Sequence, residues 1–279
     1  MSSAADSVAS TDTSGNTRST SYAPRSTLLS DLTWPEVGEA LAAGWNTVVV
    51  AAGSIEQHGP HLPLVTDTLI GDGLIGATVA RLDRAFQGPT IAIGCSEHHM
   101  AFPGTITLSK ENFKAVVKDY AQSLARHGFR LICFIPSHGG NFGPLLEAAS
   151  ELGGRIGESR VVAYGELNAF LEVMYESQRP FDVTPARAGA HAGNAETALV
   201  LDLKPELVLI DRAEEGFVGD FDQAAQELAF REGLKALTAN GILGDARGAE
   251  AEQGRACLDA LADHLAGWVR RERGDSSVG

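Results

Sequence analysis

Hydrophobic residues along this chain form two alternating patterns: short, wholly apolar runs, and longer stretches with apolar residues three or four positions apart. The first pattern is typical of strands buried on both faces of a parallel sheet, and the second indicates helices packed on that sheet. Strands are predicted at residues 47–52, 90–93, 130–136 and 160–164, and helices at 28–44, 68–86, 109–127, 142–156, 221–237 and 249–271, with one more helix within 187–202 that begins after His191. The repeated order of strand, polar loop and helix predicts an α/β fold with a mainly parallel central sheet and helices on both faces.

Local signals refine this outline. Ser109 is expected to cap the helix at 109–127, and Gly128 is expected to end it. Residues 165–185 are less regular, and we expect them to form a lid or a wall of a pocket.

Three successive predicted strands are followed by loops that carry histidine or carboxylate side chains. In chain order these side chains are Glu56, His58 and Asp67, then Glu97 and His98, then His138. Because the carboxyl ends of parallel strands meet at one edge of a sheet, we expect the loops to lie together there. Ligands of open α/β sheets bind at that edge.

The first of these loops has the pattern of a metal site. Glu56 and His58 are two positions apart and point to the same side of an extended backbone, and the Gly59 turn can bring Asp67 back toward them. Carboxylate oxygens and an imidazole nitrogen suit zinc, manganese or iron. The alternative is a solvated polar loop in which Asp67 only caps the next helix.

Other polar residues allow two interpretations each. His138 precedes two glycines, which permit close approach of a metal or, less in keeping with the pattern, of a phosphate. His191 lies just before a predicted helix, and Glu196 lies in the first turns of that helix. They are either functional groups or simply a loop histidine and an exposed carboxylate. Glu97 and His98 are either catalytic or serve to orient a ligand. On spacing, His61 and His99 remain unassigned.

Composition narrows the function classes. The chain has 279 residues and a formal net charge of −14. An acidic protein is a poor partner for nucleic acid or an anionic membrane, since both reward basic surface. No apolar run is long enough to span a bilayer. Three scattered cysteines, without metal-binding spacing, fit a reducing cytoplasm. Residues 1–26 are expected to be a disordered tail and residues 27–279 a single domain.

Four ordered motifs resemble those of the creatininase family of metal-dependent amidohydrolases. They are Gly53-Ser54-x-Glu56-Gln57-His58-Gly59-Pro60-His61-Leu62-Pro63 with Asp67; Ser96-x-His98 with Phe102-Pro103-Gly104-Thr105; His138-Gly139-Gly140-Asn141; and His191-Ala192-Gly193-x-x-Glu196-Thr197. The resemblance covers about residues 30–203. It implies a three-layer α/β/α fold, a homohexamer and a centre with two divalent metal ions per chain, zinc, manganese or iron.

The resemblance also implies a ligand set. One metal would take Glu56, Asp67 and His138, and the other His58 and Asp67, with Asp67 bridging. Creatininase supplies a further glutamate two residues after the position of His138, where this chain has Gly140. Many relatives share that glycine and keep the later Glu-Thr pair, so Glu196 is assigned as the remaining ligand.

By the same resemblance, the expected activity is hydrolysis of an amide, cyclic amide or formamide bond of a small molecule. An activated water would attack the carbonyl, His191 would pass a proton to the leaving nitrogen, and Glu97 and His98 would line the pocket. Creatininase walls its pocket with tryptophans, and none of the tryptophans here lies in a later motif, which argues against creatinine. The alternatives are a peptidase acting on a modified peptide precursor and a non-catalytic metal- or phosphate-binding module.

Overall fold

The computed structural model describes residues 22–219 and 221–275. Within them, a central sheet has the strand order β2-β1-β3-β5-β4. The strands are β1 (Thr47–Ala52), β2 (Ala85–Gln87), β3 (Leu131–Pro136), β4 (Arg155–Ile156) and β5 (Ser159–Ala163). All neighbours pair in parallel except β4, which is antiparallel to β5. The predicted mainly parallel sheet is confirmed.

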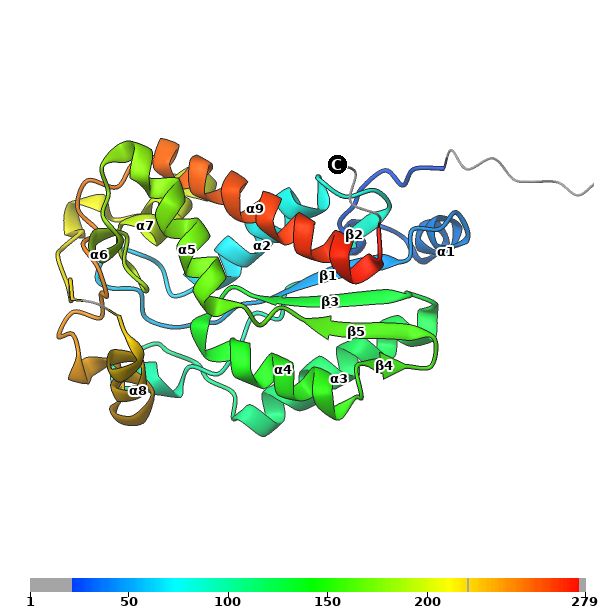
Figure 1. Ribbon diagram of the computed structural model, residues 1–279, viewed down its shortest axis with the longest axis horizontal. Helices are drawn as coiled ribbons and strands as arrows, with labels where there is room; N and C mark the ends of the chain where they lie inside the picture. Colours follow the sequence, from blue (N-terminus) through cyan, green and yellow to red (C-terminus); the bar gives the residue numbers. More distant parts are fainter. Residues whose placement is uncertain (1–21, 220, 276–279) are drawn as a thin grey trace, which may run out of the picture.

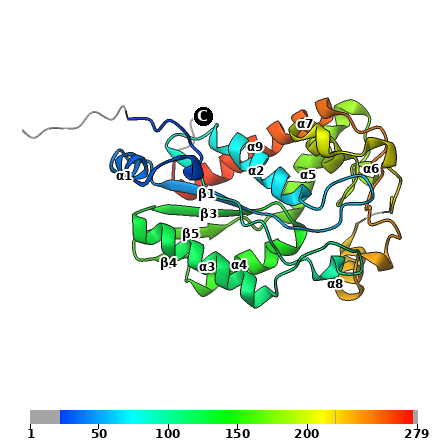
Figure 2. The same ribbon diagram turned by 180° about the vertical axis from the view of Figure 1, so that it is seen from behind.

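Helices cover both faces of the sheet, so the fold is a three-layer α/β/α sandwich (Figure 1, and from behind Figure 2). The helices α2, α5, α7 and α9 lie on one face, and α3 and α4 on the other. Their bounds are α1 (Trp34–Ala42), α2 (Thr66–Val79), α3 (Lys110–His127), α4 (Phe142–Glu151), α5 (Leu167–Gln178), α6 (Pro185–Ala188), α7 (Asn194–Leu203), α8 (Gln223–Glu232) and α9 (Ala251–Arg273).

Alternate residues of β1 belong to two different hydrophobic cores. Val48 and Val50 pack with Phe113 of α3, whereas Val49 and Ala51 pack with Leu74 of α2. Successive side chains of a strand point to opposite faces, so a strand between two helical layers must be apolar at every position. This requirement explains the uninterrupted apolar run of β1, all of which is buried.

The predicted boundaries of α3 are confirmed by its caps. The Ser109 side chain accepts a hydrogen bond from the backbone N–H of Asn112. Gly128 ends the helix with φ +100°, in the left-handed region that glycine adopts without strain.

Two predictions near the second strand are wrong. The helix predicted at 68–86 ends at Val79, and Phe86 instead lies in β2 beside Val48. The segment predicted as a strand at 90–93 makes only an isolated bridge between Ile91 and Ala52. Both apolar segments flank β1, and Pro89, which has no N–H to donate, separates them. The second segment still runs beside the carboxyl end of β1, so its polar loop reaches the expected edge.

Two further predictions need correction. The helix predicted at 142–156 stops at Glu151, because Gly153 and Gly154, both with φ +67°, turn the chain into the β4–β5 hairpin. Residues 165–185, predicted as irregular, contain the helix α5. The apolar residues of α5 pack into the same core as those of α9. This tertiary packing stabilises a helix that the local sequence pattern does not predict.

The N-terminal region is only partly described. Of the tail predicted at residues 1–26, residues 1–21 lie outside the described residues, whereas the Tyr22 carbonyl accepts a hydrogen bond from Trp45 Nε1 at 3.1 Å. Among the helices of the described part, none has the length and apolar character needed to cross a membrane.

Candidate metal centre

The carboxyl edge of the sheet brings together side chains from four separate segments. Glu56 and His58 follow β1, Asp67 is the second residue of α2, His138 follows β3, and His191 and Glu196 lie at the start of α7. The edge expected from the loop pattern is therefore where these side chains meet.

Burial excludes a solvated polar loop. Glu56 and His58 have no exposed surface, and Asp67 is 2% exposed. Asp67 does not cap its own helix either, since its carboxylate accepts a hydrogen bond from Ser54 Oγ at 2.6 Å and faces His58. Buried carboxylates are costly unless positive charge or hydrogen-bond donors compensate them.

Asp67 lies at the centre of the cluster. Its Oδ1 is 3.2 Å from His58 Nε2, and its Oδ2 is 3.2 Å from His138 Nδ1. Glu56 Oε1 is 3.3 Å from His138 Nδ1, and Glu196 Oε2 is 3.8 Å from His58 Nε2. Two ligand atoms bound to the same tetrahedral zinc ion lie about 3.3 Å apart. The cluster thus contains adjoining groups of candidate metal-binding atoms, with Asp67 between His58 and His138.

Backbone carbonyls orient the histidines of the cluster. His58 Nδ1 lies 3.1 Å from the carbonyl oxygen of Glu56, and His138 Nε2 lies 3.0 Å from that of Cys95. His191 Nε2 is 2.8 Å from the carbonyl oxygen of Gln57. A carbonyl can only accept, so each of these nitrogens carries the proton. The opposite nitrogen of each ring turns toward the carboxylates, as metal-ligating histidines do.

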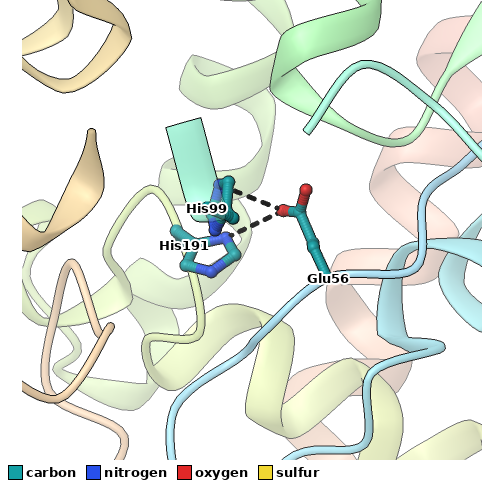
Figure 3. A group of neighbouring side chains, drawn as sticks. All are labelled: Glu56, His99 and His191. Carbon is teal, nitrogen blue, oxygen red and sulfur yellow. Dashed lines mark ion pairs between the residues drawn. The ribbon is translucent and has the colours of Figure 1, made fainter. Parts of the chain in front are cut away.

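Glu56 provides the test of whether a cation fits. Both of its carboxylate oxygens are buried, and neither has a hydrogen-bond partner among the described residues. His99 Nε2 and His191 Nδ1 approach Oε1 at 3.3 and 3.7 Å without hydrogen-bond geometry (Figure 3). A buried carboxylate that lacks hydrogen-bond partners and is ringed by imidazole nitrogens is what a divalent cation would satisfy. The residues fit the group that the resemblance implies.

The protein's own charges favour positive charge at this position. Burial would lower the pKa of His58, but the Asp67 carboxylate outweighs it and raises the pKa to about 9. The pKa of His138 is raised well above its usual range, because Glu56 and Asp67 overcome the effect of burial. For Glu196, burial raises the pKa to about 7. A divalent cation and protons therefore compete for the same nitrogens.

This competition predicts a pH dependence of metal binding. Metal uptake must displace the proton from His58, so apparent affinity should rise with pH until about 9 and fall as pH drops. Each displaced proton contributes up to about tenfold per pH unit. Calorimetric titration in buffers of different ionisation enthalpy would count the protons released. An affinity that stays constant across this range would contradict the prediction.

Gly140 explains the departure from the creatininase pattern. A Cβ at this position would lie 2.3 Å from the carbonyl oxygen of Cys95 and 2.5 Å from His138 Nε2, so no side chain fits. A glutamate here is excluded by packing, and Glu196 is the carboxylate near His58 instead. The same close packing leaves the loop turned against Cys95 rather than open toward a phosphate.

His191 is buried, and its ring centroid lies 4.2 Å from that of His58. Burial and then the charge of His58 hold its pKa well below the usual range, so the imidazole is neutral. Its Nδ1 faces Glu56 with a free lone pair. The side chain is thus placed to accept a proton next to the two ligand sets.

The predicted pair Glu97 and His98 separates in the structure. Glu97 is exposed at the first position of a short 3-10 helix at Glu97–His99. The ring of His98 stacks on that of His138 at 5.6 Å, interplanar angle 13°, and lines the cavity beside the cluster. Burial lowers the pKa of His98 to about 3, so it is a neutral wall of the site.

Two residues that the sequence left without a role lie inside the site. His99 is buried with Nε2 directed at Glu56, and Gln57 Nε2 donates to His99 Nδ1 at 3.0 Å. Gln57 Nε2 also lies 3.1 Å from the carbonyl oxygen of Gly241. For Gln57, the sequence signal that could have indicated a role was its position between the candidate ligands Glu56 and His58. For His99, the sequence offered no basis for choosing between it and the adjacent His98.

Replacing Gln57 with leucine should lower kcat about 10- to 100-fold with metal content unchanged, the usual effect of removing a group that orients a metal site. The matched control is Gln87→Leu, which removes a side-chain hydrogen bond to the Asp72 carbonyl outside the site. Kinetics and metal analysis of both variants would decide. A Gln57 variant with the parent rate would show that His99 holds its position without this hydrogen bond.

Comparison with known proteins agrees with this geometry. A family model, "Creatininase: Creatinine amidohydrolase", matches residues 30–269. A mycofactocin precursor peptide peptidase of Mycobacterium ulcerans is 32% identical over 83% of this chain and 87% of its own length. Creatinine amidohydrolase of Pseudomonas putida is 27% identical over 89% of this chain and 98% of its own. A solved manganese form of creatininase superposes with a TM-score of 0.71 at 26% identity, over 89% of this chain and 99% of that one.

Proposed function

The chain belongs to the creatininase family and is a hydrolase of carbon–nitrogen bonds, and we propose that it cleaves an amide bond at a centre for two divalent metal ions. The proposed ligands are Glu56, Asp67 and His138 for one ion and His58, Asp67 and Glu196 for the other. The observation that carries the proposal is Asp67, whose two buried oxygens each face a different histidine.

Oxygen and nitrogen donors suit zinc, manganese or iron, and a manganese form is known for a solved relative. Bound there, the ions would lower the pKa of a water from about 15.7 to about 7 and polarise the amide carbonyl.

The chain's own residues supply proton transfer and orientation. Neutral His191 accepts at Nδ1 the proton that the attacking water loses, and hands it to the leaving nitrogen. The Gln57 carbonyl holds the other ring nitrogen, so His191 keeps one tautomer and one orientation. His98 and the apolar side chains of the cavity exclude bulk water, which strengthens every charge interaction inside.

Two substrate classes fit this chemistry, small amides and peptides. Creatinine amidohydrolase acts on the first class and the mycobacterial peptidase on the second. We favour a peptide, because the cavity beside the cluster adjoins a groove of about 520 Å3, more than a small lactam needs. We also propose a cytoplasmic location and, from the family resemblance, a homohexameric assembly.

The test is metal analysis of the purified protein together with hydrolysis assays before and after chelation. We expect about two transition metal ions per chain and loss of amide hydrolysis on chelation, restored by zinc, manganese or iron. The assays should cover lactams, formamides and short peptides. A protein that takes up none of these metals, and gains no activity when they are added, would rule out the proposal.

A further inference from the structure

Two adjoining hollows lie at the carboxyl edge of the sheet. The inner cavity, of about 70 Å3, is lined by Glu56, His138 and His191 together with apolar side chains. The outer groove, of about 520 Å3, lies between α5, the segment at 185–190 and the start of α8. Leu171, Phe221, Gln226 and Leu243 line both, so the two hollows adjoin beside the candidate metal centre, and together they are called the cleft below.

The inner cavity is shaped for an apolar group. Leu167 and Leu171 of α5 line it together with Phe230 of α8 and Leu234. The Phe230 ring packs on that of His98 at 4.8 Å, and Figure 1 shows its helix, α8, beyond the carboxyl edge of the sheet. Glu56, which is buried and has no hydrogen-bond partner among the described residues, also lines this cavity. The apolar part of its lining suits an apolar group of the substrate.

The outer groove has a different character. Glu172, Glu176 and Asp222 contribute carboxylates, whereas its lining within the described residues contains no lysine, arginine or histidine. Glu176 is paired with Arg179 at 2.9 Å, and Asp222 accepts from the backbone N–H of Ala225 as the cap of α8. Glu172 is exposed and, among the described residues, has neither an ion pair nor a hydrogen bond of its side chain. The groove therefore offers uncompensated negative charge beside aromatic surface.

We propose that the substrate is a peptide that occupies the whole cleft, with an apolar residue next to the scissile amide in the inner cavity and a cationic group in the outer groove near Glu172. The cationic group is a lysine or arginine side chain. This inference rests on the proposed amide hydrolysis and adds to it the chemical class of substrate. Grooves of this volume bury most of a ligand, which makes their lining a determinant of specificity.

The experiment uses the metal-loaded protein and peptides with no other charged side chain. One lysine, or the uncharged norleucine, is placed at each peptide position in turn. Released fragments are measured by mass spectrometry to give kcat/KM. We expect leucine beside the scissile bond to exceed alanine by at least about tenfold. At one position, lysine should exceed norleucine about threefold at low salt, the scale of an exposed ion pair, and this preference should shrink as salt is added.

Variants assign the preferences to residues. Glu172→Gln should abolish the lysine preference, whereas Glu206→Gln, the same charge change at an exposed position outside the groove lining, should keep it. Phe230→Ala should reduce the discrimination between leucine and alanine without altering metal content.

The outcomes separate this inference from the proposed function. Chelator-sensitive hydrolysis of peptides with equal kcat/KM for lysine and norleucine at every position would overturn the charge assignment and leave the amide hydrolysis intact. Hydrolysis of lactams or formamides but of no peptide would overturn the peptide assignment alone. A metal-loaded protein that cleaves none of these substrates would overturn both.

Discussion

Replacing Asp67 with alanine should remove bound metal and turnover together, lowering kcat by at least about 10³-fold, since metal-ion stabilisation of developing charge is worth several kcal/mol. Among residues 22–219 and 221–275, Asp67 is the one carboxylate whose oxygens face both His58 and His138, at 3.2 Å each. Its loss disrupts both proposed ligand sets at once and removes one of the charges that raise the pKa of each histidine. Metal analysis and single-turnover hydrolysis on the same preparation would measure both effects.

The matched control is Asp72→Ala, on the same helix but exposed, where metal content and rate should stay unchanged. Asp67→Asn keeps the shape of the side chain and separates loss of charge from loss of packing. Circular dichroism checks that each variant folds. Full activity with a normal metal content in Asp67→Ala would contradict the two-metal proposal.

The second large effect is expected for His191→Ala, which should lower kcat about 10²- to 10⁴-fold and keep the metal, the range for removing a general acid–base group. His191 donates to the Gln57 carbonyl and presents Nδ1 toward Glu56, so it serves proton transfer rather than charge balance. The measurements are metal content, kcat, and the pH profile, which should lose one ionisation.

His264→Ala is the control, because His264 lies on α9 outside the site, where its ring is hydrogen-bonded to the Tyr164 hydroxyl. Its kinetics should match those of the parent protein. If His191→Ala lost metal in proportion to rate, His191 would be a ligand, which its proximity to Glu56 and His99 would then explain.

Much of the fold could be read from pattern because each layer imposes its own periodicity. The buried runs at residues 47–52 and 130–136 became β1 and β3, and the caps of α3 were predicted from Ser109 and Gly128. The strand prediction was wrong where two neighbouring segments had equally strong local signals for a strand. Residues 85–87 and 90–93 are both short and apolar, and only pairing with β1 decides which becomes the strand.

The sequence by itself determined a mainly parallel α/β sheet with helices on both faces and the edge where its polar loops gather, since these follow from periodicity, whereas the ligand set was implied by the family resemblance. Only the tertiary structure decided that Asp67 faces two histidines, that Gly140 excludes a side chain, and that α8 encloses the site. The physical reason is distance along the chain. Contacts between residues far apart in sequence depend on the packing of whole layers, and no local pattern records them.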